Sequence, residues 1–368
     1  MIVKNVNNLK RDEVDKIKPY IPGKPISEVK SEYGLDKVVK LASNENPLDI
    51  STKVEEAIKK ELNSIGLYPD GGCRLLKGKL AEKYGIDEDM IIFGNGSDGL
   101  LKVIAESFVK AEDEVVISYP TFVEYIFVAN MMGANLVRVM MDDYHQNLPA
   151  LTEAASEKTK LLFLTNPHNP AGTLFTADEF DELMNKVPDN VIVVVDEAYF
   201  EYVDDKAYPD TLEYIKKGYP IILLRTFSKA YGLAGLRIGY AVADPDIIAI
   251  LKRMRDPFNV NRIAQKAAAA ALDDKEFLEK TLEINEKGKK YLYQEFEKRG
   301  LDYVPTQSNF IMVKVNMDSM KLFKDLMKEG IIIRPGKPLG YPEHIRVSIG
   351  LPEENELFIE HVDKLIQS

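Results

Sequence analysis

Short apolar runs separated by polar or glycine-rich stretches recur along the first two thirds of the chain. Runs of this length that end in turn residues are typical of buried strands. The strands predicted in this way are residues 90–93, 113–118, 161–164, 191–195, 221–225 and 238–243. Residues 191–195 are all valine or isoleucine, which favours a strand covered on both faces, as in a parallel sheet.

Apolar residues at helical spacing fill much of the remaining chain. The predicted helices are residues 54–62, 100–105, 246–255, 261–272, 278–298, 319–328 and 352–366. In the last third, helices alternate with strands predicted at residues 308–313, 331–334 and 344–349. Ser319 is the expected N-cap of its helix and Gly330 the expected stop. We therefore expect an α/β protein whose large domain holds a mostly parallel sheet sandwiched by helices, with a smaller α+β domain after it.

The expected domain boundaries follow this division. Residues 1–40 are polar and rich in proline between positions 19 and 25, so we expect an extended N-terminal arm that packs with the small domain. The large domain is expected to span residues 41–258 and the small C-terminal domain residues 259–368.

The composition is that of an ordinary globular protein, with 45% hydrophobic and 29% charged residues among 368. The formal net charge of −11 argues against a nucleic-acid partner, because phosphate binding favours a basic surface. The first residues lack the apolar centre of a signal peptide, and no apolar run approaches the ~20 residues that span a bilayer. We therefore expect a cytoplasmic protein with no membrane partner.

Cysteine and histidine usage narrows the chemistry further. The single cysteine, Cys73, excludes an internal disulfide and is consistent with a reducing compartment. A catalytic role for its thiol and an incidental one both remain open. The four histidines, His145, His168, His344 and His361, show no ligand-like spacing, so no metal site is expected.

The stretch 226–239 carries the strongest chemical signal. It directly follows a predicted strand, so Lys229 lies where a strand opens into a loop. Small residues after the lysine leave room for a bulky group, and Thr226, Ser228 and Arg237 supply donors for an anion. A lysine amine beside an anion-binding group is the arrangement that holds pyridoxal phosphate as a Schiff base. An ordinary surface lysine is the simpler alternative.

Two other strand ends add to this pattern. Asp196 follows the buried run 191–195, and the carboxyl end of such a strand faces the crevice where α/β folds bind ligands. An unpaired carboxylate there is costly, so Asp196 suits a partner for a protonated ring nitrogen. The loop 94–99 joins a predicted strand to a helix, whose N-terminus can bind a phosphate.

The same loop supports a rival interpretation. Gly94, Gly96 and Gly99 match the G-x-G-x-x-G pattern of dinucleotide-binding folds. Asp113 and Glu114 lie near the spacing expected for a ribose-binding acid. A nicotinamide-dependent oxidoreductase is therefore an alternative. A regulator that binds pyridoxal phosphate without turnover is another, although no nucleic-acid-binding module is visible in the sequence.

Taken together, the motifs resemble those of a known family. The stretch 226–235 matches every fixed position of the Thr-x-Ser-Lys-[small]-x-[Gly/Ala]-x-x-Gly signature of the fold-type I pyridoxal-phosphate aminotransferases, in the variant of the histidinol-phosphate aminotransferases. Further motifs follow the family's order from Tyr20 to Gly350. The resemblance implies pyridoxal 5'-phosphate as the cofactor, bound in the large domain through an aldimine with Lys229. It also implies a homodimer with shared active sites.

The resemblance assigns roles to individual residues, with Lys229, Asp196 and Tyr199 as the catalytic ones. Asp196 would pair with the ring nitrogen, and Tyr199 and Asn169 would bond the ring oxygen. Phe122 would stack on the ring, where the family usually has tyrosine. The cofactor phosphate would be held by Gly96, Ser97, Asp98, Thr226, Ser228, Arg237 and, from the neighbouring subunit, Tyr68. The substrate would be held by Tyr20, Asn46, Arg334 and Arg346.

The reaction implied by the resemblance is ping-pong transamination. L-histidinol phosphate and 2-oxoglutarate would give imidazole acetol phosphate and glutamate, a step of histidine biosynthesis. Because Phe122 stands where the family usually has tyrosine, an aromatic amino acid aminotransferase on the same fold is an alternative. A threonine-phosphate decarboxylase is another.

Overall fold

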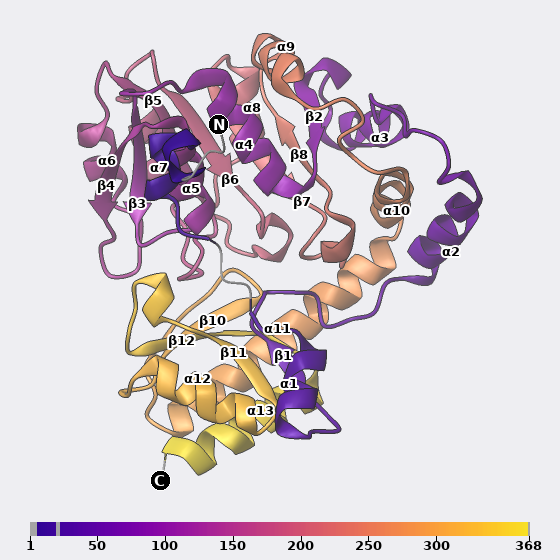
Figure 1. Ribbon diagram of the computed structural model, residues 1–368, viewed down its shortest axis with the longest axis vertical. Helices are drawn as coiled ribbons and strands as arrows, with labels where there is room; N and C mark the ends of the chain where they lie inside the picture. Colours follow the sequence, from indigo (N-terminus) through magenta and orange to yellow (C-terminus); the bar gives the residue numbers. More distant parts are fainter. Residues whose placement is uncertain (1–5, 20–22, 367–368) are drawn as a thin grey trace.

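The computed structural model of the chain describes residues 6–19 and 23–366. Figure 1 shows two domains, one above the other, each built on its own sheet. The long helix α11 (Lys275–Lys298) leads from the large upper domain into the smaller lower one (Figure 1).

The large domain is built on a sheet that has seven strands within the described residues, in the order β2-β8-β7-β6-β5-β3-β4. β8 is antiparallel to both of its neighbours, and the other pairs are parallel. The mostly parallel sheet expected from the sequence is thus confirmed. The strands are β2 (Ile91–Gly94), β3 (Glu114–Tyr119), β4 (Asn135–Met140), β5 (Thr159–Thr165), β6 (Ile192–Asp196), β7 (Ile221–Thr226) and β8 (Gly239–Val242).

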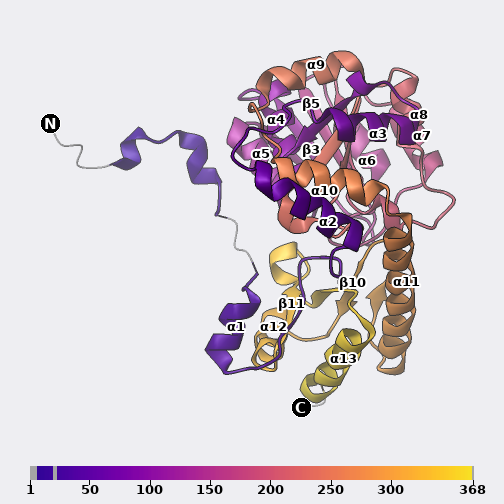
Figure 2. The same cartoon turned by 90° about the vertical axis from the view of Figure 1, so that its right-hand side faces the viewer.

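Helices cover both faces of this sheet, because alternate residues of the central strands are apolar on both sides. One face packs against α4 (Gly96–Phe108), α5 (Val123–Met132) and α9 (Pro245–Met254). The other packs against α2 (Thr52–Glu61), α3 (Arg74–Tyr84), α6 (Leu148–Ala154), α7 (Ala177–Met184), α8 (Thr211–Lys216) and α10 (Arg262–Leu272). Figure 2 shows α2 and α10 side by side on the outer face of the domain.

The small domain has a mixed sheet in the order β1-β11-β12-β10-β9 within the described chain. Its strands are β1 (Val39–Leu41), β9 (Tyr303–Val304), β10 (Phe310–Lys314), β11 (Ile331–Pro335) and β12 (His344–Ser348). Its core is shared with α11, α12 (Ser319–Lys328) and α13 (Pro352–Ile366). Short 3-10 turns occur at η1 (Val6–Leu9), η2 (Asp12–Lys16), η3 (Leu62–Ser64), η4 (Glu88–Met90), η5 (Phe200–Tyr202), η6 (Ala234–Leu236) and η7 (Lys337–Leu339).

Side-chain alternation along β12 gives the small sheet two different faces. Ile345 and Val347 lie in the small-domain core. Successive side chains of a strand point to opposite faces, so Arg346 and Ser348 lie on the other face. There the Arg346 guanidinium contacts Asn169 of the large domain. The polar face of the small sheet is therefore turned toward the junction.

The domain limits in the structure differ from the expected ones at both ends. β1 pairs in parallel with β11, so residues 39–41 belong to the small sheet. The alanines of α10 pack in the large-domain core, which places the change of domain after this helix and not at residue 259. A helix with a small-residue face can approach its neighbours closely, which explains this docking.

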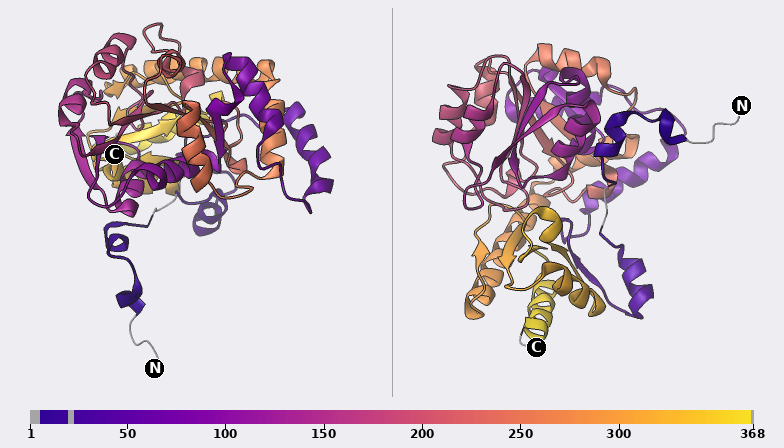
Figure 3. Two further views of the ribbon diagram at one scale, coloured as in Figure 1. Left: turned by 90° about the horizontal axis from the view of Figure 1, so that it is seen from above. Right: turned by 60° about the vertical axis from the view of Figure 1, so that its left-hand side comes forward.

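The N-terminal arm divides between the two domains. α1 (Ile26–Tyr33) packs through Val29 on α12 and β11 of the small domain. The earlier segment contacts the large domain instead, where Arg11 Nη2 donates to the backbone oxygen of Met131 at 2.9 Å. The right-hand view of Figure 3 shows the indigo segment beside the large domain and α1 beside the small one.

Two predicted helix starts also differ. α4 begins at Gly96, so most of the expected glycine loop is the first turn of the helix. The N-cap of α12 is Asp318 and not Ser319, because the Asp318 carboxylate accepts from the backbone amides of Met320 and Lys321. Gly330 follows the helix in the left-handed region with φ +83°, as a helix stop requires.

A buried ion pair links β6 and β7 inside the large domain. The Arg225 and Glu197 side chains are 4% and 0% exposed. Arg225 Nε and Nη2 donate to Glu197 Oε2 at 2.9 and 2.7 Å, and Thr211 Oγ1 donates to Glu197 Oε1 at 2.6 Å. The guanidinium also lies 3.5 Å from the centre of the Phe200 ring. The pair therefore holds the ends of two neighbouring strands together.

We expect Glu197→Ala to lower the free energy of unfolding by about 3–5 kcal/mol, because it leaves the buried Arg225 charge uncompensated. Urea unfolding of the cofactor-free protein measures this loss. Glu182→Ala is the matched control, since Glu182 pairs with Lys186 on the surface and should contribute less than about 1 kcal/mol. Equal losses for the two variants would contradict the assigned role.

Candidate active site

The predicted site residues converge because of the sheet topology. β5, β6 and β7 run in the same direction, and β2 shares it because two antiparallel pairings separate it from β7. Their carboxyl ends therefore meet at one edge of the sheet, which faces the small domain in Figure 1. β8 runs in the reverse direction, so its first residue, Gly239, lies at this edge. Gly239 is paired there with Gly94 of β2 and Thr226 of β7.

An anion-binding cradle forms where α4 starts. Arg237 Nη2 donates to Asp98 Oδ2 at 2.9 Å. A Cβ on Gly96 would lie 2.6 Å from the Arg237 guanidinium, and a Cβ on Gly239 would lie 2.7 Å from the Ser97 amide nitrogen. The two glycines therefore let the guanidinium and β8 approach the first turn of the helix. Free amides of a helix N-terminus next to a guanidinium favour a bound phosphate.

Two hydroxyls from the end of β7 stand beside this cradle. Thr226 Oγ1 donates to Ser228 Oγ at 3.0 Å and accepts from the Ser228 amide at 3.1 Å. Both side chains are buried. This turn fixes the direction in which the chain enters Lys229, the next residue.

Lys229 is half-buried, and its Nζ donates to the backbone oxygen of Ser43 at 3.1 Å. Nζ also lies 5.7 Å from the centre of the Tyr199 ring. Burial, and next the positive charge of Arg346, lower the pKa of the Lys229 amine to about 8. An amine with this pKa is partly neutral near neutral pH and can act as a nucleophile and a base.

Asp196 is buried at the end of β6. Its Oδ2 accepts from Tyr125 Oη at 2.9 Å and its Oδ1 from the Ala198 amide at 3.1 Å. Burial raises the pKa of Asp196 to about 6, and these hydrogen bonds act in the opposite direction. The Asp98 carboxylate raises the pKa of both Asp196 and Lys229, so the three groups lie within electrostatic range of one another.

Tyr199, Asn169 and Arg346 form a connected chain across the domain junction. Asn169 Nδ2 donates to Tyr199 Oη at 3.2 Å, and Arg346 Nη1 donates to Asn169 Oδ1 at 2.6 Å. Arg346 is directly opposite Arg334 in the pairing of β11 and β12. The structure thus brings both predicted substrate arginines to the same part of the small sheet, where two guanidiniums can bind a phosphate or carboxylate.

Phe122 precedes α5 and is partly buried. Its ring meets Tyr125 edge to face at 5.6 Å, and Tyr125 in turn stacks on Phe163 at 4.8 Å. Since Tyr125 also bonds Asp196, the predicted stacking ring and the predicted carboxylate share one neighbour.

Two further predicted residues, Asn46 and Tyr68, have contacts outside this group of side chains, and a third lies outside the described part of the chain. The Asn46 amide donates to the backbone oxygen of Ala230 at 2.9 Å and to Thr281 Oγ1 at 3.0 Å, so in this structure it supports the Lys229 loop. Tyr68 is 79% exposed on the outer surface and stacks on Phe258 at 4.7 Å. Tyr20 lies outside the described residues.

Two contacts to these groups were not anticipated from the sequence. Tyr125 follows Phe122 by three residues, which is one helical turn, and this spacing could have indicated it. Asn44 Nδ2 donates to Tyr199 Oη at 2.9 Å. No local signal distinguishes Asn44 from Asn46, because its contact depends on how the two domains dock.

The dinucleotide interpretation of residues 94–99 is not supported by the geometry. Asp113 and Glu114 lie at the amino end of β3, whereas the loop in question lies at the carboxyl end of β2. These are opposite edges of the sheet. Glu114 Oε2 instead accepts from Ser156 Oγ at 2.7 Å. The acid therefore cannot reach a ribose whose phosphate is bound at α4.

The other sequence features do not contribute to this site. Cys73 is buried, and burial raises the pKa of its thiol to about 11, which disfavours the reactive thiolate. Within the described residues no group of three or more histidine, cysteine or acidic side chains could hold a metal ion. None of the helices in the described part of the chain combines the length and apolar character of a membrane span.

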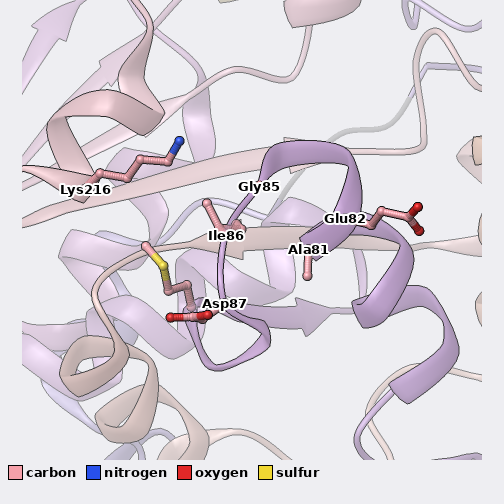
Figure 4. A pocket seen from close by; sticks show the side chains of 7 residues that line it. Ala81, Glu82, Gly85, Ile86, Asp87 and Lys216 are labelled. Atoms are coloured by element: carbon pink, nitrogen blue, oxygen red, sulfur yellow. The ribbon is translucent and has the colours of Figure 1, made fainter.

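A separate hollow of about 420 Å³ lies elsewhere on the large domain (Figure 4). It is lined by Ala81, Glu82, Gly85, Ile86, Asp87, Met90 and Lys216. Met90 precedes β2 and Lys216 precedes β7, so this hollow lies at the amino edge of the sheet. It is therefore distinct from the candidate active site.

The donor set at the carboxyl edge fits pyridoxal phosphate. The backbone amides of the first turn of α4 and the Arg237 guanidinium suit its phosphate, and the missing Cβ of Gly96 lets the guanidinium lie beside that turn. The Lys229 amine suits its aldehyde and the buried Asp196 carboxylate its ring nitrogen.

Comparisons with known proteins agree with this chemistry. The sequence profile of the family Aminotransferase class I and II matches residues 36–362. A histidinol-phosphate aminotransferase from Moorella thermoacetica is 46% identical over 97% of this chain and 92% of its own length. One from Caldicellulosiruptor saccharolyticus is 45% identical over 97% of this chain and 99% of its own.

A solved structure shows the same likeness in three dimensions. Histidinol-phosphate aminotransferase from Sinorhizobium meliloti, in complex with pyridoxal-5'-phosphate, superposes with a TM-score of 0.89 at 29% identity and covers 97% of each chain. The profile match spans most of the sequence and the relatives align over nearly all of it, so this chain belongs to the aminotransferase class I and II family.

Proposed function

We propose that the chain is a pyridoxal-phosphate-dependent transaminase that transfers the amino group of L-histidinol phosphate to 2-oxoglutarate, giving imidazole acetol phosphate and glutamate. The central observation is the half-buried Lys229 amine, whose pKa is lowered to about 8, within electrostatic range of Asp98 and the Arg237 that pairs with it. The relatives named above support this substrate, as does the pair of arginines on the small sheet.

In this proposal each residue acts on a stated atom. Pyridoxal phosphate, when bound, withdraws electrons from the substrate carbon that carries the amino group. The neutral Nζ of Lys229 takes the proton from that carbon. The Asp196 carboxylate holds a proton on the ring nitrogen, and Tyr125 Oη, which donates to Asp196 Oδ2, keeps the carboxylate oriented. Arg334 and Arg346 bind the substrate phosphate.

We further propose a homodimer as the active unit. Large apolar side chains are exposed along the segment from the end of α2 to the start of α3, and Phe258 stacks on Tyr68 of this segment. Exposed apolar surface of this kind marks a protein contact. These residues are Leu62, Ile65, Leu67, Tyr68, Leu75 and Phe258. Tyr68 lies within this surface, so a second copy seated there would receive its hydroxyl.

A cytoplasmic location is part of the proposal, supported by the free thiol of Cys73.

A substrate panel tests the reaction. Half-reactions with histidinol phosphate, phenylalanine, aspartate and threonine phosphate can be followed by the visible spectrum of the loaded enzyme. We expect the fastest conversion with histidinol phosphate. Rapid conversion of phenylalanine with none of histidinol phosphate would instead favour an aromatic aminotransferase, and release of carbon dioxide from threonine phosphate a decarboxylase.

Lys229→Ala is expected to abolish turnover and the covalent retention of the cofactor, because it removes the amine that would form the covalent bond. Borohydride reduction followed by mass spectrometry measures the covalent adduct, which should be found on Lys229 in the unmodified protein and be missing in the variant. Lys216→Ala is a control, since Lys216 lies at the amino edge of the sheet, opposite the site. An adduct that persists in Lys229→Ala would refute the assignment.

The lowered pKa of Lys229 predicts a pH profile for the cofactor-free protein. Below about pH 8 the amine is mostly protonated, so its reactivity should rise about tenfold per pH unit and level off above pH 8. Competitive acetylation measures how this reactivity depends on pH. Mass spectrometry compares the acetylation of Lys229 with that of a free lysine amide, whose amine has a pKa of about 10.4. A half-maximum near that of the free amide would show that burial does not act on this amine.

The shared site predicts complementation between two variants. Tyr68→Ala and Lys229→Ala should each have strongly reduced activity, whereas unfolding and refolding them together should restore about one quarter of the wild-type activity. Half of the randomly formed dimers are mixed, and each mixed dimer has one intact site. Activity assays measure the recovery, and light scattering shows whether the refolded mixture is dimeric. No recovery of activity in a dimeric mixture would refute a role for Tyr68 in the neighbouring site.

A further inference from the structure

The Tyr199 hydroxyl has both of its acceptor positions filled by amides. A phenolic hydroxyl offers one donor and up to two acceptor positions. Asn44 Nδ2 donates to Tyr199 Oη at 2.9 Å and Asn169 Nδ2 at 3.2 Å. An NH₂ group can only donate, so the hydroxyl proton must point away from both. Within the described chain no side chain or carbonyl accepts that proton.

The Asn44 amide is held in one orientation by Ser348. The Asn44 backbone N–H donates to Ser348 Oγ at 2.9 Å, which leaves the serine proton free to donate to Asn44 Oδ1 at 3.2 Å. With Oδ1 turned toward Ser348, Nδ2 must face Tyr199. Asn309 Nδ2 donates to the Asn44 backbone oxygen at 3.0 Å and completes the arrangement. All four polar groups of Asn44 are therefore used.

The contact crosses the domain junction. Asn44 follows β1 of the small sheet, is 1% exposed and has the left-handed backbone with φ +55° that asparagine tolerates better than most residues. Tyr199 follows β6 of the large sheet. The hydrogen-bond direction at Tyr199 is thus set from the small domain.

We propose that Asn44 is a positioning residue that fixes Tyr199 as a hydrogen-bond donor toward the ring oxygen of the bound cofactor. This inference rests on the proposed function, in which Tyr199 faces that oxygen. A donor to an anionic oxygen stabilises the charged form. In the loaded enzyme the Tyr199 hydroxyl would therefore favour the form in which the ring oxygen is negatively charged. In that form the nitrogen that joins Lys229 to the cofactor has no proton.

The test is a pH titration of the visible absorption of the holoenzyme. Asn44→Gly removes the amide while accepting the left-handed backbone, so it avoids the strain that alanine would introduce. The midpoint of the spectral transition should move upward by about one pH unit. Tyr199→Phe should move it at least as far. Asn44→Gly added to Tyr199→Phe should cause no additional shift, because the group that Asn44 orients is gone.

Two further variants keep the test decisive. Asn309→Ala removes the bond to the Asn44 backbone oxygen but leaves the amide, and should leave the midpoint in place. Ser348→Ala frees the Asn44 amide to rotate and should move the midpoint upward by less than Asn44→Gly does. If thermal unfolding shows that Asn44→Gly is not folded, the midpoint of Ser348→Ala tests the inference in its place.

The inference is overturned if folded Asn44→Gly has an unchanged midpoint. If that variant is unfolded, an unchanged midpoint in Ser348→Ala overturns it. An equal shift in Asn309→Ala also overturns it, because that result would indicate general loosening of the junction. Failure of the proposed function gives a different result, since Tyr199→Phe alone would then leave the midpoint unchanged or the wild type would show no titrating visible band.

Discussion

The removal of water from the Lys229 amine is the constraint on which the rest of the site depends. The amine lies at the junction of the two domains, and burial lowers its pKa to about 8. A solvated lysine near neutral pH would be protonated and unable to attack or to accept a proton. The same low-dielectric surroundings make every unpaired polar group costly, which explains why Asp196 and Tyr199 both have fixed hydrogen-bond partners.

Sheet topology determines which groups share these surroundings. Strands that run in the same direction end at one edge, so residues as far apart in sequence as Asp98 and Arg237 become neighbours. β8, which runs antiparallel to both of its neighbours, contributes Gly239, where a side chain would collide with the first turn of α4. The anion cradle therefore depends as much on a missing Cβ as on the charged groups that line it.

The small domain completes the site through one face of its sheet. Alternation along β12 buries Ile345 and Val347 and turns Arg346 toward Asn169 of the large domain. Asn44, which follows β1, reaches Tyr199 from the same side. The arginine proposed to bind the substrate and the asparagine proposed to orient the Tyr199 hydroxyl thus both come from the small domain, so any movement between the domains would change both contacts at once.

Local pattern was sufficient for much of this protein. Apolar runs located the core strands, and the residues at their ends, among them Lys229, Asp196 and Asn169, are neighbours in sequence of the strands that carry them. Asn44 and the Arg225–Glu197 pair were not foreseen, because each contact joins segments distant in sequence. Tyr125 was not foreseen either, although its spacing from Phe122 is a local signal. The docking of α10 on the large domain was likewise missed. The sequence by itself determined which elements form and which residues stand at their ends, since these depend on neighbours along the chain. Only the tertiary structure decided which of those residues meet, because hydrogen-bond partners and desolvation are properties of packing in space.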